Sequence, residues 1–272
     1  ASGYGLTADD VRAAVDRDVA RGLVPLYLCA TVGTTGLGAV DPVRELGEEA
    51  RRHGMWLHVD AAYAGSAAIC PEFQGTLDGA ELADSVSMNP HKWFLTNADC
   101  CCLWVASPGA LTSALSTDPE YLKNVGTDGT GKPAAIDYKD WQISLSRRFR
   151  AIKLWVVLRR YGAVGLRAHI RRHVTTAKWF ERTVAADERF EVVVCFRLRE
   201  RFAGDDAADE LNRELLTAVN ASGRAFVTHF VVDGKFVIRL AVGGVMTEMR
   251  HVMDVWELLQ GSADNVLRCY SY

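Results

Sequence analysis

The sequence predicts an α/β fold with a mostly parallel sheet, followed by a smaller α/β unit. Over the first 105 or so residues, apolar runs of strand length alternate with amphipathic stretches of helix length. Strand–helix–strand alternation is typical of α/β layers, and continuous apolar runs are typical of strands covered on both faces. A second, shorter set of strand and helix patterns begins near residue 190. We therefore expect two units, each with its own sheet.

The first unit opens with a helix and then alternates. The stretch 7–22 has a threonine N-cap signal, acidic residues in its first turn and a final glycine, which together predict a helix. The apolar run 24–33 that follows is read as a strand covered on both faces. The further elements expected in this unit are a helix at 43–54, a strand and loop at 55–65, and strands at 83–88 and 100–107.

A glycine-rich stretch separates the two units. Residues 118–140 have little apolar content and are expected to form a mobile catalytic loop. The long helical pattern at 147–188 is interrupted near Tyr161 and Gly162, and we place the domain boundary inside it, giving domains 1–155 and 156–272. The second unit is expected to contain a strand segment at 190–198, a helix at 205–223, two strands within 224–244 joined by an Asp-Gly turn, and a helix at 247–267.

Composition narrows the function classes. The chain has 272 residues and 29.9 kDa, with 49% hydrophobic and 24% charged residues, as in an ordinary globular protein. A formal charge of −3 gives no electrostatic case for a nucleic-acid surface, and no apolar run has the roughly 18 residues that a membrane span needs. The seven cysteines form no C-x-x-C pair, so we expect thiols in a reducing, cytoplasmic compartment. Because no initiator methionine opens the chain, we expect an N-terminally truncated protein.

No metal site is expected. The segment HIRRH at 169–173 places two histidines one helical turn apart. Without a third ligand nearby, a plain helix surface is the favoured interpretation over a metal centre.

Two residues suggest a specific chemistry. Asp60 ends the apolar strand WLHVD, and Lys92 lies in the later segment SMNPHKWFL. A lone aspartate is more often a helix cap or an ion-pair partner, but the small residues of AAYAG after Asp60 leave room for a flat molecule. An aspartate that can hold a pyridinium nitrogen protonated and a lysine that can form a Schiff base are the two protein groups that pyridoxal phosphate requires.

Several segments in order resemble one enzyme family. LHVDAAYAGSAAICPEF and NPHKW, together with ATVGTT, DPEYLKN, DYKDWQI and RRFRAIKLW, resemble the group II pyridoxal-phosphate decarboxylases, and among them the plant-type aromatic L-amino acid decarboxylases for tyrosine or dopa. The resemblance implies the fold type I (aspartate aminotransferase-like) architecture, with part of the large domain and the small C-terminal domain. It also implies a homodimer with the active site at the subunit interface. The family's N-terminal segments have no counterpart here.

The resemblance assigns roles residue by residue. Lys92 becomes the Schiff-base lysine and Asp60 the partner of the ring nitrogen. Ala62 would pack against the ring, Thr35 would lie near it, and Asn89 would contribute to the phosphate site. Taken singly, Ala62 could be core filler, and Thr35 and Asn89 could be turn residues.

Three more residues receive roles in the reaction. His91 would approach cofactor and substrate, or else be a satisfied loop histidine. Tyr121 matches the mobile-loop tyrosine that returns a proton in the decarboxylases, where the related aldehyde synthases have phenylalanine; the alternative is an aromatic that pins the loop. Ser146 occupies a position where serine accompanies phenolic substrates, or else caps the following helix.

The function implied is decarboxylation of an aromatic L-amino acid to its amine and carbon dioxide, with tyrosine or dopa favoured over tryptophan. One alternative is an aromatic aldehyde synthase of the same family. Another is a non-catalytic fragment that only dimerises.

Overall fold

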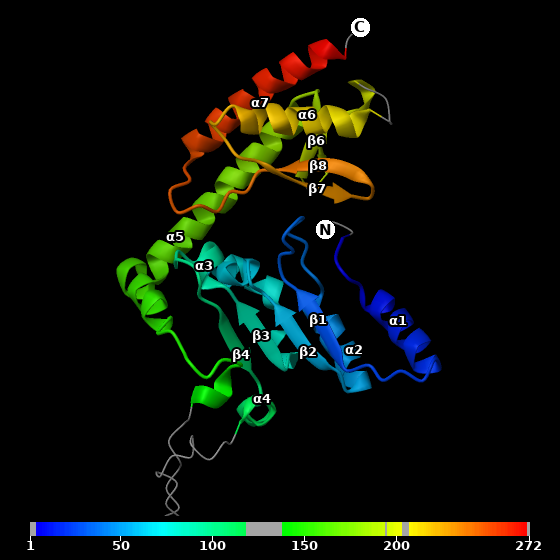
Figure 1. The fold of residues 1–272 in the computed structure, drawn as a ribbon, viewed down its shortest axis with the longest axis vertical. Coiled ribbons are helices and arrows are strands. Elements are labelled where there is room, and N and C mark those ends of the chain that lie inside the picture. Colours follow the sequence, from blue (N-terminus) through cyan, green and yellow to red (C-terminus); the bar gives the residue numbers. More distant parts are fainter. Residues whose placement is uncertain (1–3, 118–137, 194, 203–206, 271–272) are drawn as a thin grey trace, which may run out of the picture.

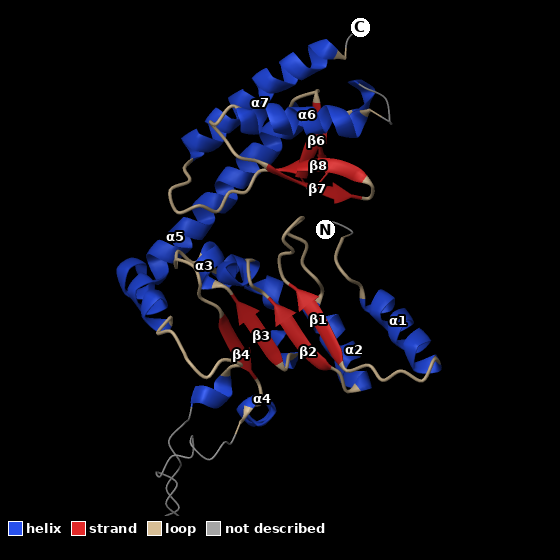
Figure 2. Ribbon diagram, in the orientation of Figure 1, coloured by secondary structure: helices blue, strands red, loops and turns tan. Residues whose placement is uncertain are grey.

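Two α/β units, each built around its own four-stranded sheet, make up the protein (Figure 1). The computed structural model describes residues 4–117, 138–193, 195–202 and 207–270. The units are connected by the long helix α5 (Ala151–Ala186), which runs from beside the first sheet up to the second (Figure 2). The α/β class predicted from the sequence is confirmed.

The first sheet has the strand order β1-β2-β3-β4. Strands β1, β2 and β3 are parallel, while β4 pairs antiparallel with β3 at the edge, so the sheet is mostly parallel as predicted. The register places Asp60 opposite Thr31 on one neighbour and Ser87 on the other. The strands are β1 (Tyr27–Thr31), β2 (Trp56–Asp60), β3 (Ser85–Met88) and β4 (Cys102–Val105).

Helices pack on one face of this sheet. In α1 the Thr7 side chain accepts the Asp10 amide, which confirms the predicted N-cap, and Val11 and Val15 pack with the buried side chains of α2 and the strands. The α-helices of this unit are α1 (Ala8–Ala20), α2 (Val43–His53), α3 (Pro90–Trp93) and α4 (Pro108–Leu115). Short 3₁₀ helices occur at Ala64–Ile69, Pro71–Leu77, Ala80–Leu82 and Tyr138–Trp141.

The opposite face of the first sheet is more open than its sequence predicted. Leu57 and Val59 are buried under the helices, whereas Trp56, His58 and Asp60 point the other way and are only partly buried. On β1 the Tyr27 side chain on that face is 57% exposed. The expectation that the run 24–33 is covered on both faces is therefore wrong for the described residues, because α1 and α2 cover one face only.

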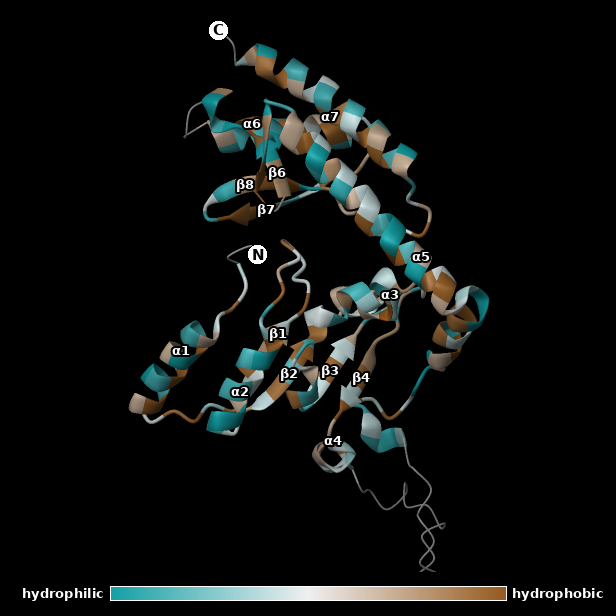
Figure 3. Ribbon diagram, turned by 180° about the vertical axis from the view of Figure 1, so that it is seen from behind, coloured by the Kyte–Doolittle hydropathy of each residue, from teal (hydrophilic) through white to brown (hydrophobic). Residues whose placement is uncertain are grey.

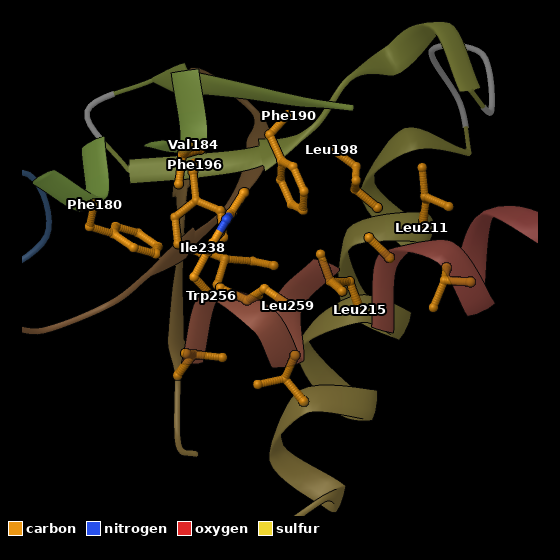
Figure 4. Close-up of a cluster of buried hydrophobic side chains, with 14 of the residues drawn as sticks. Phe180, Val184, Phe190, Phe196, Leu198, Leu211, Leu215, Ile238, Trp256 and Leu259 are labelled. Atoms are coloured by element: carbon orange, nitrogen blue, oxygen red, sulfur yellow. The ribbon is translucent and has the colours of Figure 1, made fainter. Parts of the chain in front are cut away.

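The second unit is an antiparallel sheet of order β5-β6-β8-β7 packed against helices. The segment 190–198, read as one strand segment, forms two paired strands; its nearly unbroken apolar run carries no turn signal. Its core joins aromatic and aliphatic side chains such as Phe190, Phe196 and Trp256 (Figure 4). The elements are β5 (Phe190–Val193), β6 (Cys195–Leu198), a 3₁₀ helix (Glu200–Phe202), α6 (Ala208–Ala221), β7 (Thr228–Val232), β8 (Lys235–Arg239) and α7 (Met249–Cys269).

Two backbone features match the sequence. Asp233 and Gly234 have φ values of 50° and 78°, as a two-residue hairpin turn between β7 and β8 requires. Gly162 interrupts α5 with non-helical angles (φ 59°, ψ 178°), at the predicted place. The domain boundary near residue 155 remains a prediction.

In the part of the chain that the structure describes, no helix is both long and apolar enough to cross a membrane. All seven cysteines are free thiols.

Candidate active site

The predicted site residues gather where the parallel strands of the first sheet end. Asp60 is the last residue of β2, Asn89 directly follows β3, and the loop 33–38 follows β1. The carboxyl ends of parallel strands lie along one edge of a sheet, and this edge is where α/β proteins bind ligands. The backbone joins these segments further, since the Asn89 amide donates to the Ala62 carbonyl oxygen at 3.0 Å.

Asp60 presents a carboxylate without a cationic partner. Its Oδ1 accepts the backbone amide of Ala62 at 2.9 Å, which fixes the side chain across the start of the following turn. Within the described residues no lysine, arginine or histidine forms an ion pair with it. A partly buried, ionised carboxylate without an ion-pair partner is stabilised when a positive group binds beside it. Asp60 is therefore suited to a ligand that carries a proton on nitrogen.

Lys92 lies on the one-turn helix α3. Pro90 occupies the first helical position, where its missing N–H costs nothing, and the Lys92 amide donates to the Asn89 carbonyl oxygen at 2.9 Å. Asn89 is the N-cap, yet its side chain makes no capping hydrogen bond. The Lys92 side chain is exposed, and its ammonium has no ion pair in the described parts of the chain. Both side chains thus remain available to a ligand.

The pKa of Cys101 responds to both charged groups, and this cysteine was not identified from the sequence. Desolvation raises the pKa of the Cys101 thiol, with further contributions from Cys100 and from the Asp60 carboxylate, while the Lys92 ammonium lowers that pKa. The charges of Asp60 and Lys92 therefore act on the same sulfur atom. Its signal in the sequence was only its place at the start of the strand after the lysine turn.

His91 contacts the backbone of the next loop. Its Nδ1 lies 2.7 Å from the carbonyl oxygen and 3.1 Å from the amide nitrogen of Cys100. This contact fastens the lysine turn to the start of β4. It supports the interpretation of His91 as a loop histidine with a structural partner, and the proposed approach to cofactor and substrate remains a prediction.

Thr35 is exposed and lies on a tightly held loop. Thr34 Oγ1 accepts the Ala39 amide at 3.0 Å, and Gly33 has φ 87°. A Cβ atom at Gly33 would lie 2.6 Å from the Cβ of Ala64, so only glycine allows this close approach between the loop and the segment after Asp60. The glycine keeps Thr35 at the sheet edge.

Beneath the lysine turn lies a buried aromatic group that the sequence analysis missed. The Tyr63 and Trp93 rings stack at 5.0 Å and 9°, and Trp93 Nε1 donates to His173 Nδ1 on α5 at 3.0 Å. His169 and His173 are buried, with ring centroids 4.2 Å apart. The interpretation of 169–173 as a plain helix surface is thus wrong. The described residues contain no group of three or more side chains able to hold a metal ion.

The outcome for the last two predicted residues differs. Ser146 is exposed, and its carbonyl oxygen accepts Gln142 Nε2 at 3.1 Å. The alternative that Ser146 caps the long helix is wrong, because α5 begins at Ala151 with Arg150 as its N-cap. Tyr121 lies outside the described residues.

The arrangement fits pyridoxal phosphate. An exposed amine without an ion pair at Lys92 could hold an aldehyde, and the unpaired carboxylate of Asp60 could hold a protonated ring nitrogen. Apart from Tyr63, the residues 61–65 after Asp60 are small, and a Cβ atom at Gly65 would lie 2.8 Å from Ala61 Cβ. The backbone therefore packs closely there.

Comparison with known proteins gives a consistent picture. The model of the family described as "Pyridoxal-dependent decarboxylase conserved domain" matches residues 2–200. Tyrosine/DOPA decarboxylase 1 of Papaver somniferum is 51% identical over 284 residues, covering 98% of this chain and 54% of that protein. Phenylacetaldehyde synthase of a Rosa hybrid cultivar is 48% identical over 283 residues, covering 99% of this chain and 55% of that protein.

A solved structure agrees with the fold. The crystal structure of Oryza sativa TDC with PLP and tryptamine superposes with a TM-score of 0.92 at 48% identity, covering 97% of this chain and 56% of that one. The chain thus spans about half the length of the curated relatives it matches.

Proposed function

Because the chain belongs to the pyridoxal-dependent decarboxylase family, we propose that it carries the cofactor-binding lysine and aspartate of an enzyme that decarboxylates an aromatic L-amino acid. The observation that carries this proposal is the pair Asp60 and Lys92. Neither has an ion pair among the described residues, and the charges of both reach Cys101. Opposite charges that both lack an ion-pair partner are suited to a ligand that offers a partner to each.

Each residue near the pair has a distinct task. Pyridoxal phosphate, when bound, draws the electrons of the bond to the substrate carboxyl group into its ring. Lys92 would hold the cofactor aldehyde through its amine until the substrate amine displaces it. Asp60 would keep a proton on the ring nitrogen. Asn89 would contribute to the phosphate site, while Ala62 and Thr35 would bound the space of the ring.

The remaining residues would act on the substrate. Tyr121 would donate a proton to the substrate carbon that lost its carboxyl group, and His91 would approach cofactor and substrate from beside the lysine. Ser146 would favour a hydroxylated ring. Tyrosine or dopa is therefore our preferred substrate over tryptophan, supported by the relative named tyrosine/DOPA decarboxylase.

A second candidate function is aldehyde synthesis, favoured by the 48% identity to a phenylacetaldehyde synthase. Decarboxylation yields one amine and one carbon dioxide per amino acid. Aldehyde synthesis consumes one oxygen and one water and yields aldehyde, carbon dioxide, ammonia and hydrogen peroxide. We expect amine without peroxide when the chain, supplied with pyridoxal phosphate, is given tyrosine, dopa or tryptophan in turn. If hydrogen peroxide formed in a one-to-one ratio with carbon dioxide, the activity would be aldehyde synthesis and not simple decarboxylation.

We further propose that the enzyme is a homodimer. The half of α5 before the Gly162 kink exposes several large apolar side chains, and the hydropathy of this helix can be followed in Figure 3. An apolar stripe of this kind commonly marks a protein–protein interface. Its exposed members are Ile152, Trp155, Val156, Leu158 and Tyr161, with Val164 just after the kink.

We place the protein in the cytoplasm. The seven free cysteines support this placement, because thiols persist in a reducing compartment.

A further inference from the structure

An aromatic stack joins the two turns that carry the proposed cofactor residues. Tyr63 is the third residue after Asp60, and Trp93 directly follows Lys92. The two rings are nearly parallel, with an interplanar angle of 9° and centroids 5.0 Å apart. Stacked rings of this kind contribute stabilisation beyond the burial of their surface. The lysine turn is thus packed directly against the turn that follows Asp60.

Apolar side chains surround this stack. The Trp93 side chain is buried and Tyr63 is partly buried. Both belong to a small apolar cluster that also contains Phe73 and, from α5, Ile170 and Val174. Apolar burial is non-directional, so it holds the indole in the interior but does not fix its orientation.

One directional contact fixes the indole. Trp93 Nε1 donates at 3.0 Å to Nδ1 of His173 on α5, and His173 is buried. An indole N–H can only donate, so Nδ1 is the acceptor and the imidazole proton is on Nε2. Burial, and then the charge of Arg172, lowers the pKa of His173, while hydrogen bonds with the backbone at 244 and 247 oppose this shift. A neutral imidazole keeps the acceptor that Trp93 needs.

We propose that Tyr63, Trp93 and His173 are positioning residues for Lys92, and that their stack and hydrogen bond fix the lysine turn against the turn after Asp60. This inference rests on the proposed function of Lys92 as the cofactor lysine. The three residues act through the turn and not on the reacting atoms. A lysine amine and a ring held at Asp60 react only when their relative position is correct, and small errors of position are costly.

Two pairs of variants separate position from packing. Asparagine and leucine have nearly the same shape, but only the asparagine amide oxygen can replace Nδ1, so His173→Asn keeps an acceptor for Trp93 that His173→Leu removes. Tyr63→Phe likewise keeps the stacked ring that Tyr63→Leu removes. Val184→Ala is the control for a general loss of stability, because Val184 is buried on α5 in the core of the second unit and should lower the midpoint of urea unfolding.

The first measurement uses the chain without cofactor. The Lys92 amide donates to the Asn89 carbonyl oxygen at 2.9 Å, and such an amide exchanges with deuterium only when this bond opens. Its exchange, followed by mass spectrometry, should be at least about fivefold faster in His173→Leu and in Tyr63→Leu. It should change less than about twofold in His173→Asn, Tyr63→Phe and Val184→Ala, because none of these loosens the lysine turn.

The second measurement adds pyridoxal phosphate. Titration of the absorption band of lysine-bound cofactor should give a Kd at least about fivefold weaker in His173→Leu than in the unchanged chain. The variant His173→Asn should restore the Kd to within about twofold, and Val184→Ala should leave it unchanged. Borohydride reduction and peptide mapping then show whether Lys92 carries the label in each protein.

Three results would overturn the proposal. They are unchanged exchange and Kd in His173→Leu, no recovery in His173→Asn, or equal effects of Val184→Ala and His173→Leu. Each of them leaves the label on Lys92 and therefore the decarboxylase proposal intact. If Lys92 of the unchanged chain takes no label, the decarboxylase proposal fails instead, and the exchange rates alone decide whether the stack holds the turn. If His173→Leu does not fold, Tyr63→Phe and Tyr63→Leu decide in the same two measurements.

Discussion

The indole Nε1–H of Trp93 donates a 3.0 Å hydrogen bond to Nδ1 of His173, across 80 residues of sequence. Trp93 directly follows the proposed cofactor lysine, and His173 is on the helix that connects the two units. Both side chains are buried. The lysine turn is thus attached to α5 through one specific polar contact.

Removing the acceptor should destabilise the fold. His173→Phe leaves the Trp93 N–H buried without a partner, which typically costs about 1–3 kcal/mol in the free energy of unfolding. Urea unfolding would measure the loss. In the double variant Trp93→Phe/His173→Phe the loss should be smaller than the sum of the single losses, because the unpaired donor is gone. Additive losses would contradict a coupling through this hydrogen bond.

His169 should make stability depend on pH. Burial, together with the nearby His173 and Arg172, lowers the pKa of His169 from 6.5 to about 4. Between these pH values the unfolded chain binds the proton more readily than the folded chain, so the free energy of unfolding falls as pH drops from 6.5 to 4, by up to about 3 kcal/mol.

The variant His169→Gln isolates this effect from the carboxylates that titrate in the same range. Its free energy of unfolding should fall less steeply from pH 6.5 to 4 than that of the unchanged chain. Parallel pH profiles for the two proteins would show that the imidazole is protonated equally in the folded and unfolded states.

Asp60→Asn should separate folding from chemistry. The amide oxygen of asparagine can still accept the Ala62 N–H, so stability should change by less than about 0.5 kcal/mol. The charge that would hold a proton on the cofactor ring is lost, and amine formation should fall by about a hundredfold or more. Asp78→Asn, at an exposed ion pair with Arg44, is the matched control and should keep its activity. Equal activity of the two variants would remove Asp60 from the proposed mechanism.

Trp155→Glu should weaken self-association. This indole is 60% exposed on the apolar half of α5, and a carboxylate there would have to be buried in a dimer. Sedimentation velocity should show the unchanged chain at about twice its 29.9 kDa mass and the variant shifted towards the monomer. Phe226→Glu alters a residue that is 80% exposed on the second unit and should not change the association. If Phe226→Glu shifted the protein towards the monomer and Trp155→Glu did not, the interface would lie on the second unit and not on α5.

Much of the fold was predictable because local signals agreed with the tertiary structure. Thr7 caps α1, Gly162 interrupts α5, and the Asp-Gly pair turns between β7 and β8. The two strands within 190–198 were missed, since that segment has no glycine, proline or asparagine to mark the turn.

The surroundings of the site were less predictable than its chemistry. The choice of Asp60 and Lys92 rests on residue types, their order and the family resemblance, and their roles stay a prediction. His173, the hydrogen-bond partner of Trp93, is brought near the lysine turn only by the tertiary packing of α5, and in sequence a buried histidine pair cannot be told from a helical surface. The sequence likewise could not show that one face of the first sheet stays open. A continuous apolar run does not distinguish a strand covered on one face from a strand covered on both.

The proposed lysine can be tested directly. The chain is mixed with pyridoxal phosphate, its absorbance spectrum is recorded, and borohydride reduction is followed by peptide mapping. We predict an absorption band of lysine-bound cofactor and a covalent label on Lys92 that Lys92→Ala abolishes, whereas Lys178→Ala, at another exposed lysine, keeps it. A label on other lysines with Lys92 unmodified would contradict the central claim that Lys92 and Asp60 form the cofactor site.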